Sequence, residues 1–153
     1  MALNQSKVGS SYPTYRYEVS REKIREYAVA LGETDPRYHS EGDDCVAPPT
    51  FAASFTLTRG LMLLLGDADL GAHPALVHGS QAFRYGTRPV RPGDVLDCTP
   101  RITSITTRGR NEFLTTVVDC RFADSGDVAV EAETVIVFLG SAPQEDAATE
   151  GAA

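Results

Sequence analysis

The 153-residue chain lacks three features that would place it in a special class of protein. No apolar run approaches the ~20 residues that cross a bilayer. Residues 1–6 have neither the basic nor the apolar region of a secretory signal. A basic excess is also missing, because the formal net charge is −7 at pH 7. That acidity argues against nucleic-acid binding, and we expect a globular protein of the cytoplasm.

Cysteine is scarce and shows no pairing pattern. The three cysteines, Cys45, Cys98 and Cys120, are an odd number and have neither CxxC nor His-paired metal spacing. We therefore predict reduced thiols, no bound metal and no cofactor. Cys98 and Cys120 lie in strand-like runs and should be small buried apolar residues. Cys45 precedes an apolar segment and could face a substrate channel, but it has no base nearby.

What the chain does have is the composition of one globular domain. Hydrophobic residues make up 42% and charged residues 23%, and the length suits a single domain with a real core. We assign residues 1–140 to this domain. Residues 141–153 are rich in Ala and Gly and carry three acidic side chains, and we predict that they are disordered.

The order of patterns along the chain predicts an α+β fold. An amphipathic helix is expected over residues 21–31, with Ser20 as N-cap, Gly32 at its end and one apolar face formed by Ile24, Tyr27, Ala28 and Leu31. Behind Pro48 and Pro49, a second helix is expected over residues 50–65; it is apolar almost all round and should be buried. Alternating runs separated by turn residues predict strands over 15–19, 77–87, 95–107, 112–122 and 128–139. Most strands follow the helices, which indicates an antiparallel sheet wrapped on one long helix.

The loop between the two helices resembles a known motif. MaoC-like (R)-specific enoyl hydratases of the hot-dog fold carry Gly-Asp-x-Asn-Pro-x-His there, and the Asp and His form their acid/base pair. In this chain Glu33 takes the Asp position, Asp35 the Asn position and Tyr38 the His position, while Pro36 matches. His39 lies one place too late. The resemblance therefore implies a hot-dog fold with a broken catalytic dyad.

Further segments resemble the FAS1-like dehydratase subfamily, the MaoC dehydratase N-terminal domain, which carries this degenerate loop. These segments are residues 17–28, Ala-Pro-Pro-Thr-Phe at 47–51, Val-His-Gly-x-Gln-x-Phe-x-Tyr at 77–85 and Arg-Pro-Val-Arg-Pro-Gly-Asp at 88–94. The similarity covers residues 3–139. In such proteins a degenerate subunit pairs with one that carries the dyad, and the acyl tunnel of the resulting double hot dog lies between them.

Dehydration of a β-hydroxyacyl thioester needs a base for the α-proton and an acid for the leaving hydroxyl. The resemblance makes Glu33, Asp35, Tyr38 and His78 the candidate catalytic residues. An acidic loop is usually only solvated, and a phenol is a poor base at neutral pH. The Tyr38 ring is therefore expected to pack on the loop or to line a channel. His78 is a strand histidine that could contact an acyl thioester at a subunit interface.

Candidate substrate-binding residues lie in two places. Thr50 and Phe51, with Phe55 one turn later, mark the start of the second helix, where unpaired backbone N–H groups could hold a thioester oxygen. Arg88 and Arg91 belong to a segment, residues 84–110, with six arginines and two aspartates, a local charge of +4. This segment is either a solvated face or a binding site for carrier phosphates.

Three functions from different classes fit these observations. The first is a subunit of a (3R)-hydroxyacyl-ACP or hydroxyacyl-CoA dehydratase of fatty-acid or polyketide metabolism, which shapes the acyl tunnel for a catalytic partner. The second is a self-sufficient homodimeric hydratase or dehydratase with an altered acid/base set. The third is a non-enzymatic protein that binds acyl thioesters.

Overall fold

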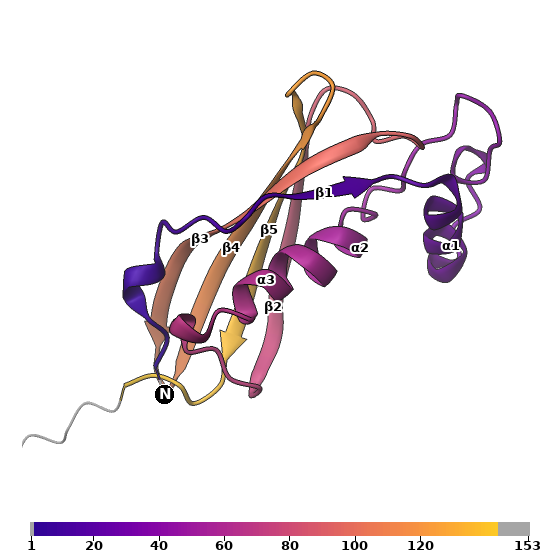
Figure 1. Ribbon diagram of the computed structural model, residues 1–153. Coiled ribbons are helices and arrows are strands. Elements are labelled where there is room, and N and C mark those ends of the chain that lie inside the picture. Colours follow the sequence, from indigo (N-terminus) through magenta and orange to yellow (C-terminus); the bar gives the residue numbers. More distant parts are fainter. Residues whose placement is uncertain (1, 144–153) are drawn as a thin grey trace, which may run out of the picture.

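The computed structural model describes residues 2–143 as a five-stranded antiparallel sheet with helices on one face (Figure 1). The strand order is β1-β3-β4-β5-β2. The strands are β1 (Tyr15–Glu18), β2 (Leu76–Tyr85), β3 (Val95–Arg108), β4 (Asn111–Phe122) and β5 (Val128–Phe138). Each predicted strand is present, and each of its ends lies within two residues of the predicted position. The predicted α+β class and antiparallel sheet are confirmed.

Helix α1 (Arg21–Leu31) has the predicted ends. The Ser20 side chain accepts a hydrogen bond from the Lys23 N–H, and Gly32 adopts the left-handed conformation (φ 72°) that favours glycine at a helix end. Ile24 and Ala28 are buried, but Leu31, predicted on the same apolar face, is 52% exposed. That prediction was wrong because α1 lies beyond α2 and away from the sheet (Figure 1), so only part of its apolar face reaches the core.

The central helix, residues 53–65, starts later and is less regular than its sequence predicts. It consists of α2 (Ala53–Phe55), a π-helical segment (Thr56–Leu61) and α3 (Met62–Leu65). Residues 50–52 form turns. It is also not buried all round, because Met62 and Leu63 are 56% and 41% exposed. A helix that lies on one face of a sheet buries only the side that contacts the sheet.

Contacts with β1 and β4 account for the π-helical segment. The Tyr15 hydroxyl donates to the Phe55 carbonyl at 2.9 Å, and a side chain that takes a helix carbonyl disturbs the regular i→i−4 ladder. Gly60 lies so close to β4 that an added Cβ would come 2.7 Å from the Val118 Cγ2 atom. The helix can therefore approach the sheet only with glycine at this position.

Small buried residues make room for the helix on the inner face of the sheet. Cys98 of β3 lies directly opposite Cys120 of β4, and both are fully buried. Their contact, together with burial, raises the pKa of the Cys120 thiol, as expected for inert structural cysteines. Cys45 is only 1% exposed, so it does not face an open channel in this chain.

The packing continues slightly beyond the predicted domain end. Ser141 is 3% exposed, and the Ala142 N–H donates to the Arg110 carbonyl at 3.2 Å. The remaining part of the predicted tail, residues 144–153, lies outside the described residues. Among residues 2–143, no helix is long and apolar enough to cross a membrane.

Candidate functional site

The loop that follows α1 holds its aspartate in an ion pair. Asp35 accepts from the Arg37 N–H at 2.9 Å, and its Oδ2 lies 2.7 Å from Nη2 of the Arg37 guanidinium. These contacts start the 3-10 turn Pro36–Tyr38. The hydrogen bond from the Arg37 side chain lowers the pKa of Asp35 to about 2. At neutral pH this carboxylate is ionised and already paired, so it is a poor proton donor.

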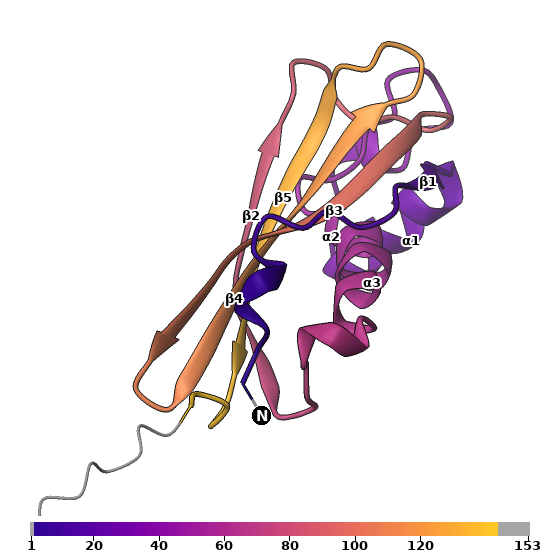
Figure 2. The same cartoon turned by 60° about the vertical axis from the view of Figure 1, so that its left-hand side comes forward.

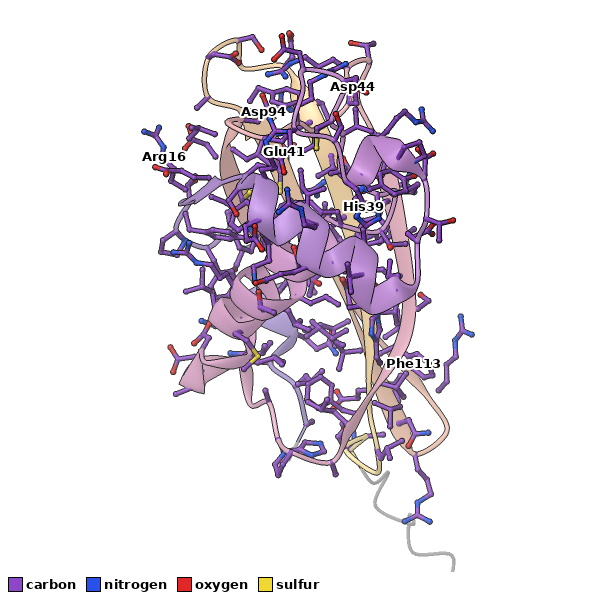
Figure 3. All side chains as sticks on the ribbon, turned by 90° about the vertical axis from the view of Figure 1, so that its right-hand side faces the viewer. Arg16, His39, Glu41, Asp44, Asp94 and Phe113 are labelled. Carbon is purple, nitrogen blue, oxygen red and sulfur yellow. The ribbon has the colours of Figure 1, made fainter. Side chains whose placement is uncertain are left out.

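The other loop candidates are also held in local contacts or point to solvent. Glu33 is exposed, and its backbone carbonyl lies 2.9 Å from Nε2 of His39. Tyr38 is partly buried, and its hydroxyl makes no hydrogen bond within residues 2–143. Figure 3 shows His39 beside α1, at the same end of the molecule as Glu41 and Asp44. The loop therefore packs around α1.

His78 comes from a different element. It lies on edge strand β2 opposite Ile136 of β5, where the register shifts before Ser80. The exposed imidazole has Nε2 3.0 Å from the Ser80 carbonyl. Within the described residues, no hydrogen bond or ion pair joins His78 to Glu33, Asp35 or Tyr38. The fold of this chain alone does not assemble the four catalytic candidates into one acid/base group.

Two tyrosines hold the start of the central helix. The Tyr27 hydroxyl from α1 donates to the Thr50 carbonyl at 2.8 Å, and the Tyr85 hydroxyl from β2 donates to the Pro49 carbonyl. Burial raises the pKa of Tyr85 to about 12, with a smaller opposing effect of the Ala52 N–H. The Tyr85 phenol is therefore neutral, and both hydroxyls are fixed hydrogen-bond donors beside the turns at residues 50–52.

The aromatic side chains predicted to bind substrate fill the core. Phe51 and Phe55 are each 1% exposed. Phe51 packs edge-on against Tyr27, with ring centroids 5.6 Å apart, and Phe55 stacks on Tyr17 at 4.4 Å. Any contact of Phe51 with a bound acyl group would thus go through its backbone, whereas Thr50 is exposed. Their role in substrate binding stays a prediction.

A cavity of about 230 Å³ opens beside the start of the central helix. It is lined by Ala47, Pro49 and residues 85–90. Arg88 forms one wall, but its guanidinium already pairs with Asp94 at 2.9 Å and lies over the Phe122 ring at 3.4 Å. The cavity is therefore a mainly apolar groove with a phenol at one side and a neutralised arginine at the other.

Arg91 is engaged in the same turn. Its backbone N–H donates to the Asp94 carboxylate at 2.7 Å, and its guanidinium donates to the Asp43 carbonyl. Arg88 and Arg91 thus stabilise the turn before β3 and the loop at residues 40–47. Their proposed contact with a carrier phosphate stays a prediction, and it would require these partners to be exchanged.

The chemistry available to this chain follows from its donors. The groove offers phenol, backbone and guanidinium groups but no imidazole or unpaired carboxylate that contacts it. Among the described residues, no group of three or more His, Cys, Asp or Glu side chains could hold a metal ion. The groove can bind and orient an apolar acyl group, but it does not supply both the base and the acid that elimination requires.

Comparisons with known proteins assign the chain to one family. A family model described as "FAS1-like, dehydratase domain region" matches residues 6–132. The UPF0336 protein SCO4636 of Streptomyces coelicolor is 44% identical over 123 residues, covering 74% of this chain and 81% of that protein. The chain belongs to the FAS1-like dehydratase domain family, which is a MaoC-like family of the hot-dog fold.

Solved structures agree with this assignment. A chain of the C-terminally truncated HadBC (3R-hydroxyacyl-ACP dehydratase) complex from Mycobacterium tuberculosis is 29% identical, with a TM-score of 0.66, covering 83% of this chain and 92% of that one. A chain of the ChsH1-ChsH2 complex from the same organism shares the fold, with a TM-score of 0.68 at 16% identity over 92% of this chain and 90% of that one. The hot-dog fold and a hydratase/dehydratase family are thereby confirmed.

Tyr27 and Tyr85 are the functional candidates that the sequence reasoning missed. Tyr85 ends the motif at residues 77–85, and Tyr27 lies on the apolar face of α1, so both occurred in segments that carried the resemblance. Their joint position on residues 49–50 depends on the packing of α1 and β2 around the central helix. The sequence holds no local signal that α1 and β2 meet there.

Proposed function

We propose that this chain is a non-catalytic subunit of a two-chain dehydratase that removes water from (3R)-hydroxyacyl thioesters of fatty-acid or polyketide metabolism. One observation carries the proposal: Tyr38 stands where the motif requires an imidazole, so the loop of this chain has no Asp/His pair. The acyl group would be carried on acyl carrier protein or CoA. A dyad-bearing partner would supply base and acid, while this chain would shape the acyl tunnel.

The open edge of the sheet supports pairing with a second chain. Strand β2 is ten residues long and pairs only with β5 in the described part of the chain. Most of its residues are exposed, including Val77 at 46%. Long unpaired edges are usually covered in native proteins. A partner strand added to β2 would place its own groups beside His78 and near the groove at Tyr85.

The similar structures are consistent with such an assembly. HadBC and ChsH1-ChsH2 are both complexes of two differently named proteins, and the HadBC complex is described as a (3R)-hydroxyacyl-ACP dehydratase. These descriptions apply to those complexes. For this chain, the identity of the partner, the carrier and the location in the cytoplasm are part of the proposal.

The test compares the purified chain alone with the chain co-expressed with a MaoC-like protein that has the intact Gly-Asp-x-Asn-Pro-x-His loop. We expect negligible hydration of crotonyl thioesters by the chain alone and clear activity of the complex. Replacing the partner's motif histidine should abolish that activity, whereas Glu33→Gln in this chain should preserve most of it. Robust turnover by the isolated chain, lost in His78→Ala or Glu33→Gln, would instead establish a self-sufficient homodimer.

A further inference from the structure

The outer face of the sheet, opposite the helices, has an apolar area at one end. Register places Val77 of β2, Val137 of β5 and Phe113 of β4 side by side in one cross-strand row, with Val135 and Thr115 adjacent in the next row. We call these five residues the outer patch. Figure 2 shows the helices on the other side of the sheet, and Figure 3 shows Phe113 on the side away from the central helix.

An apolar outer patch departs from the usual pattern of such a sheet. An antiparallel sheet with one covered face normally carries polar residues on the other. Toward β1 and the end of β4 the rule holds, because Glu131 and Glu133 of β5 lie opposite Arg84 and Ala82 of β2. In the outer patch, by contrast, Val77 is 46% exposed and Phe113 is only half-buried. Contiguous exposed apolar side chains of this kind mark interaction sites.

Arginines without carboxylate partners border the outer patch. The Arg108 guanidinium lies 5.5 Å from the centroid of the Phe113 ring, Arg110 follows in the β3–β4 turn, and Arg101 lies one row beyond Thr115. Within residues 2–143, none of these three arginines has a carboxylate within 4 Å. The other eleven basic side chains, Arg84 and Arg88 among them, form ion pairs or donate to backbone carbonyls. The three arginines that have no carboxylate partner in the described residues thus lie around one apolar surface.

We infer that the outer patch docks an acidic protein surface, apolar at its centre and bearing carboxylates at its rim. Aromatic and arginine side chains are the residues that contribute most to protein interfaces. A second copy of this chain fits less well, because the nearest carboxylates on this face, Glu131 and Glu133, are paired with Arg84 at 3.1 and 4.0 Å. The inference concerns the face opposite the helices and does not depend on the proposed dehydratase pairing.

A defined probe tests the inference on the full chain. The probe is an 18-residue amphipathic helical peptide with a leucine face flanked by glutamates, and its control is the same peptide with lysines in place of the glutamates. We expect the glutamate peptide to bind, with affinity that falls as salt rises. Arg108→Glu with Arg110→Glu should weaken it at least about tenfold and should allow the lysine peptide to bind. Phe113→Ala should weaken the binding of the glutamate peptide. Added to the arginine double variant, it should also weaken the binding of the lysine peptide.

A matched control distinguishes an effect at the outer patch from an effect of net charge alone. Arg16→Glu with Arg121→Glu changes the net charge by the same amount, but both arginines already pair with aspartates at 2.9 and 3.0 Å. This variant should bind the glutamate peptide nearly as wild type does. Circular dichroism confirms that each variant is folded before it is compared.

Four results would overturn the inference. They are no binding of the glutamate peptide, equal binding of the two peptides, equal weakening by the control variant, and binding only to anionic lipid vesicles. A fifth concerns the chain itself, whose residues Glu145, Asp146 and Glu150 follow the described part. If the peptide binds only after residues 144–153 are deleted, the outer patch belongs to the chain's own acidic end and not to a partner.

Discussion

At the scale of single residues, Asp35 shows how a loop aspartate can be removed from acid/base chemistry without being buried. Its carboxylate is held by the backbone and side chain of Arg37, two residues away, in a contact that depends only on local sequence. The charge of the guanidinium favours the ionised form. The Asn position of the motif is thus occupied by an aspartate with little tendency to carry a proton at neutral pH.

The first prediction concerns this titration. In the folded chain the pKa of Asp35 is lowered to about 2 from its ordinary 3.8. The group therefore stabilises the fold at pH above the ordinary value, and its contribution is lost as pH falls toward 2. In Arg37→Gln, a carboxyl-detected NMR titration should raise the Asp35 midpoint from about 2 toward 3.8 but not fully to it, because the backbone N–H of residue 37 still donates to the carboxylate. An unchanged midpoint would show that the backbone N–H of residue 37 alone lowers the pKa.

The second prediction concerns Gly60. An alanine Cβ would lie 2.7 Å from the Val118 Cγ2 atom, and such overpacking costs about 1–3 kcal/mol. That cost exceeds the gain of up to about 1 kcal/mol from the better helix propensity of alanine. Gly60→Ala should therefore lower the free energy of unfolding in urea. Combining it with Val118→Ala should recover part of the loss relative to the sum of the single variants, and strict additivity would contradict the clash.

At the scale of elements, the central helix is shaped by what packs on it. The sequence of residues 50–65 predicts one regular apolar helix, yet the Tyr15 hydroxyl takes the Phe55 carbonyl and a π-helical segment follows. Just before the same helix, Tyr27 and Tyr85 hold residues 49–50. The position of the helix start relative to the groove is consequently set by three phenols from three different elements.

The third prediction follows from the hydrogen bond of Tyr15. Tyr15→Phe leaves the buried Phe55 carbonyl without this donor, so it should cost on the order of 1 kcal/mol of unfolding free energy. Amide hydrogen exchange should increase most within residues 56–61. Tyr38→Phe is the matched control, because the Tyr38 hydroxyl makes no hydrogen bond in the described part of the chain. If both variants lose equal stability, the Tyr15 hydroxyl does not control the π-helical segment.

At the scale of the whole molecule, one layer of sheet and helices leaves three surfaces open. The β2 edge is unpaired on one side, the outer patch is apolar, and the helix exposes Met62 and Leu63 at 56% and 41%. The net charge of −7 disfavours non-specific self-association of such a molecule. These surfaces are consistent with a chain that functions in an assembly.

The fourth prediction concerns assembly at the β2 edge. Ala82→Lys places a charge on the exposed edge strand β2, and a charged side chain on an edge strand disfavours pairing with another strand. Sedimentation should show that wild type forms a homodimer or a tight heterodimer with its partner, and that the variant associates more weakly. A stable wild-type monomer at micromolar concentration, with or without the partner, would contradict the edge-pairing hypothesis.

The fifth prediction concerns the end of the chain. Deleting residues 144–153, whose composition offers little apolar area to bury, should leave the melting temperature nearly unchanged. Deleting residues 141–153 should lower it by about 2–4 °C, because it also removes the buried Ser141 and the hydrogen bond from Ala142 to Arg110. Equal melting temperatures of the two truncated chains would show that residues 141–143 contribute nothing.

The sequence by itself determined the class of fold, the order of elements and the family, because period, capping and turn residues act over short distances. Ser20, Gly32 and the alternating strands are local signals, and the structure agrees with them. The replacement of the motif histidine by Tyr38 was likewise evident from a single motif. What these signals could not predict was the exposure of Leu31, the π-helical segment, the ion pair of Arg88 with Asp94 and the hydrogen bond of the Arg91 guanidinium to the Asp43 carbonyl.

Only the tertiary structure decided those features, because each depends on residues far apart in the chain. Tyr15 reaches Phe55 across forty positions, and Arg88 meets Asp124 across thirty-six. The same is true of the outer patch, whose residues come from β2, β4 and β5 and become neighbours only through strand register. Alternation along one strand indicates that a face exists, whereas the pairing of three strands decides which side chains share it.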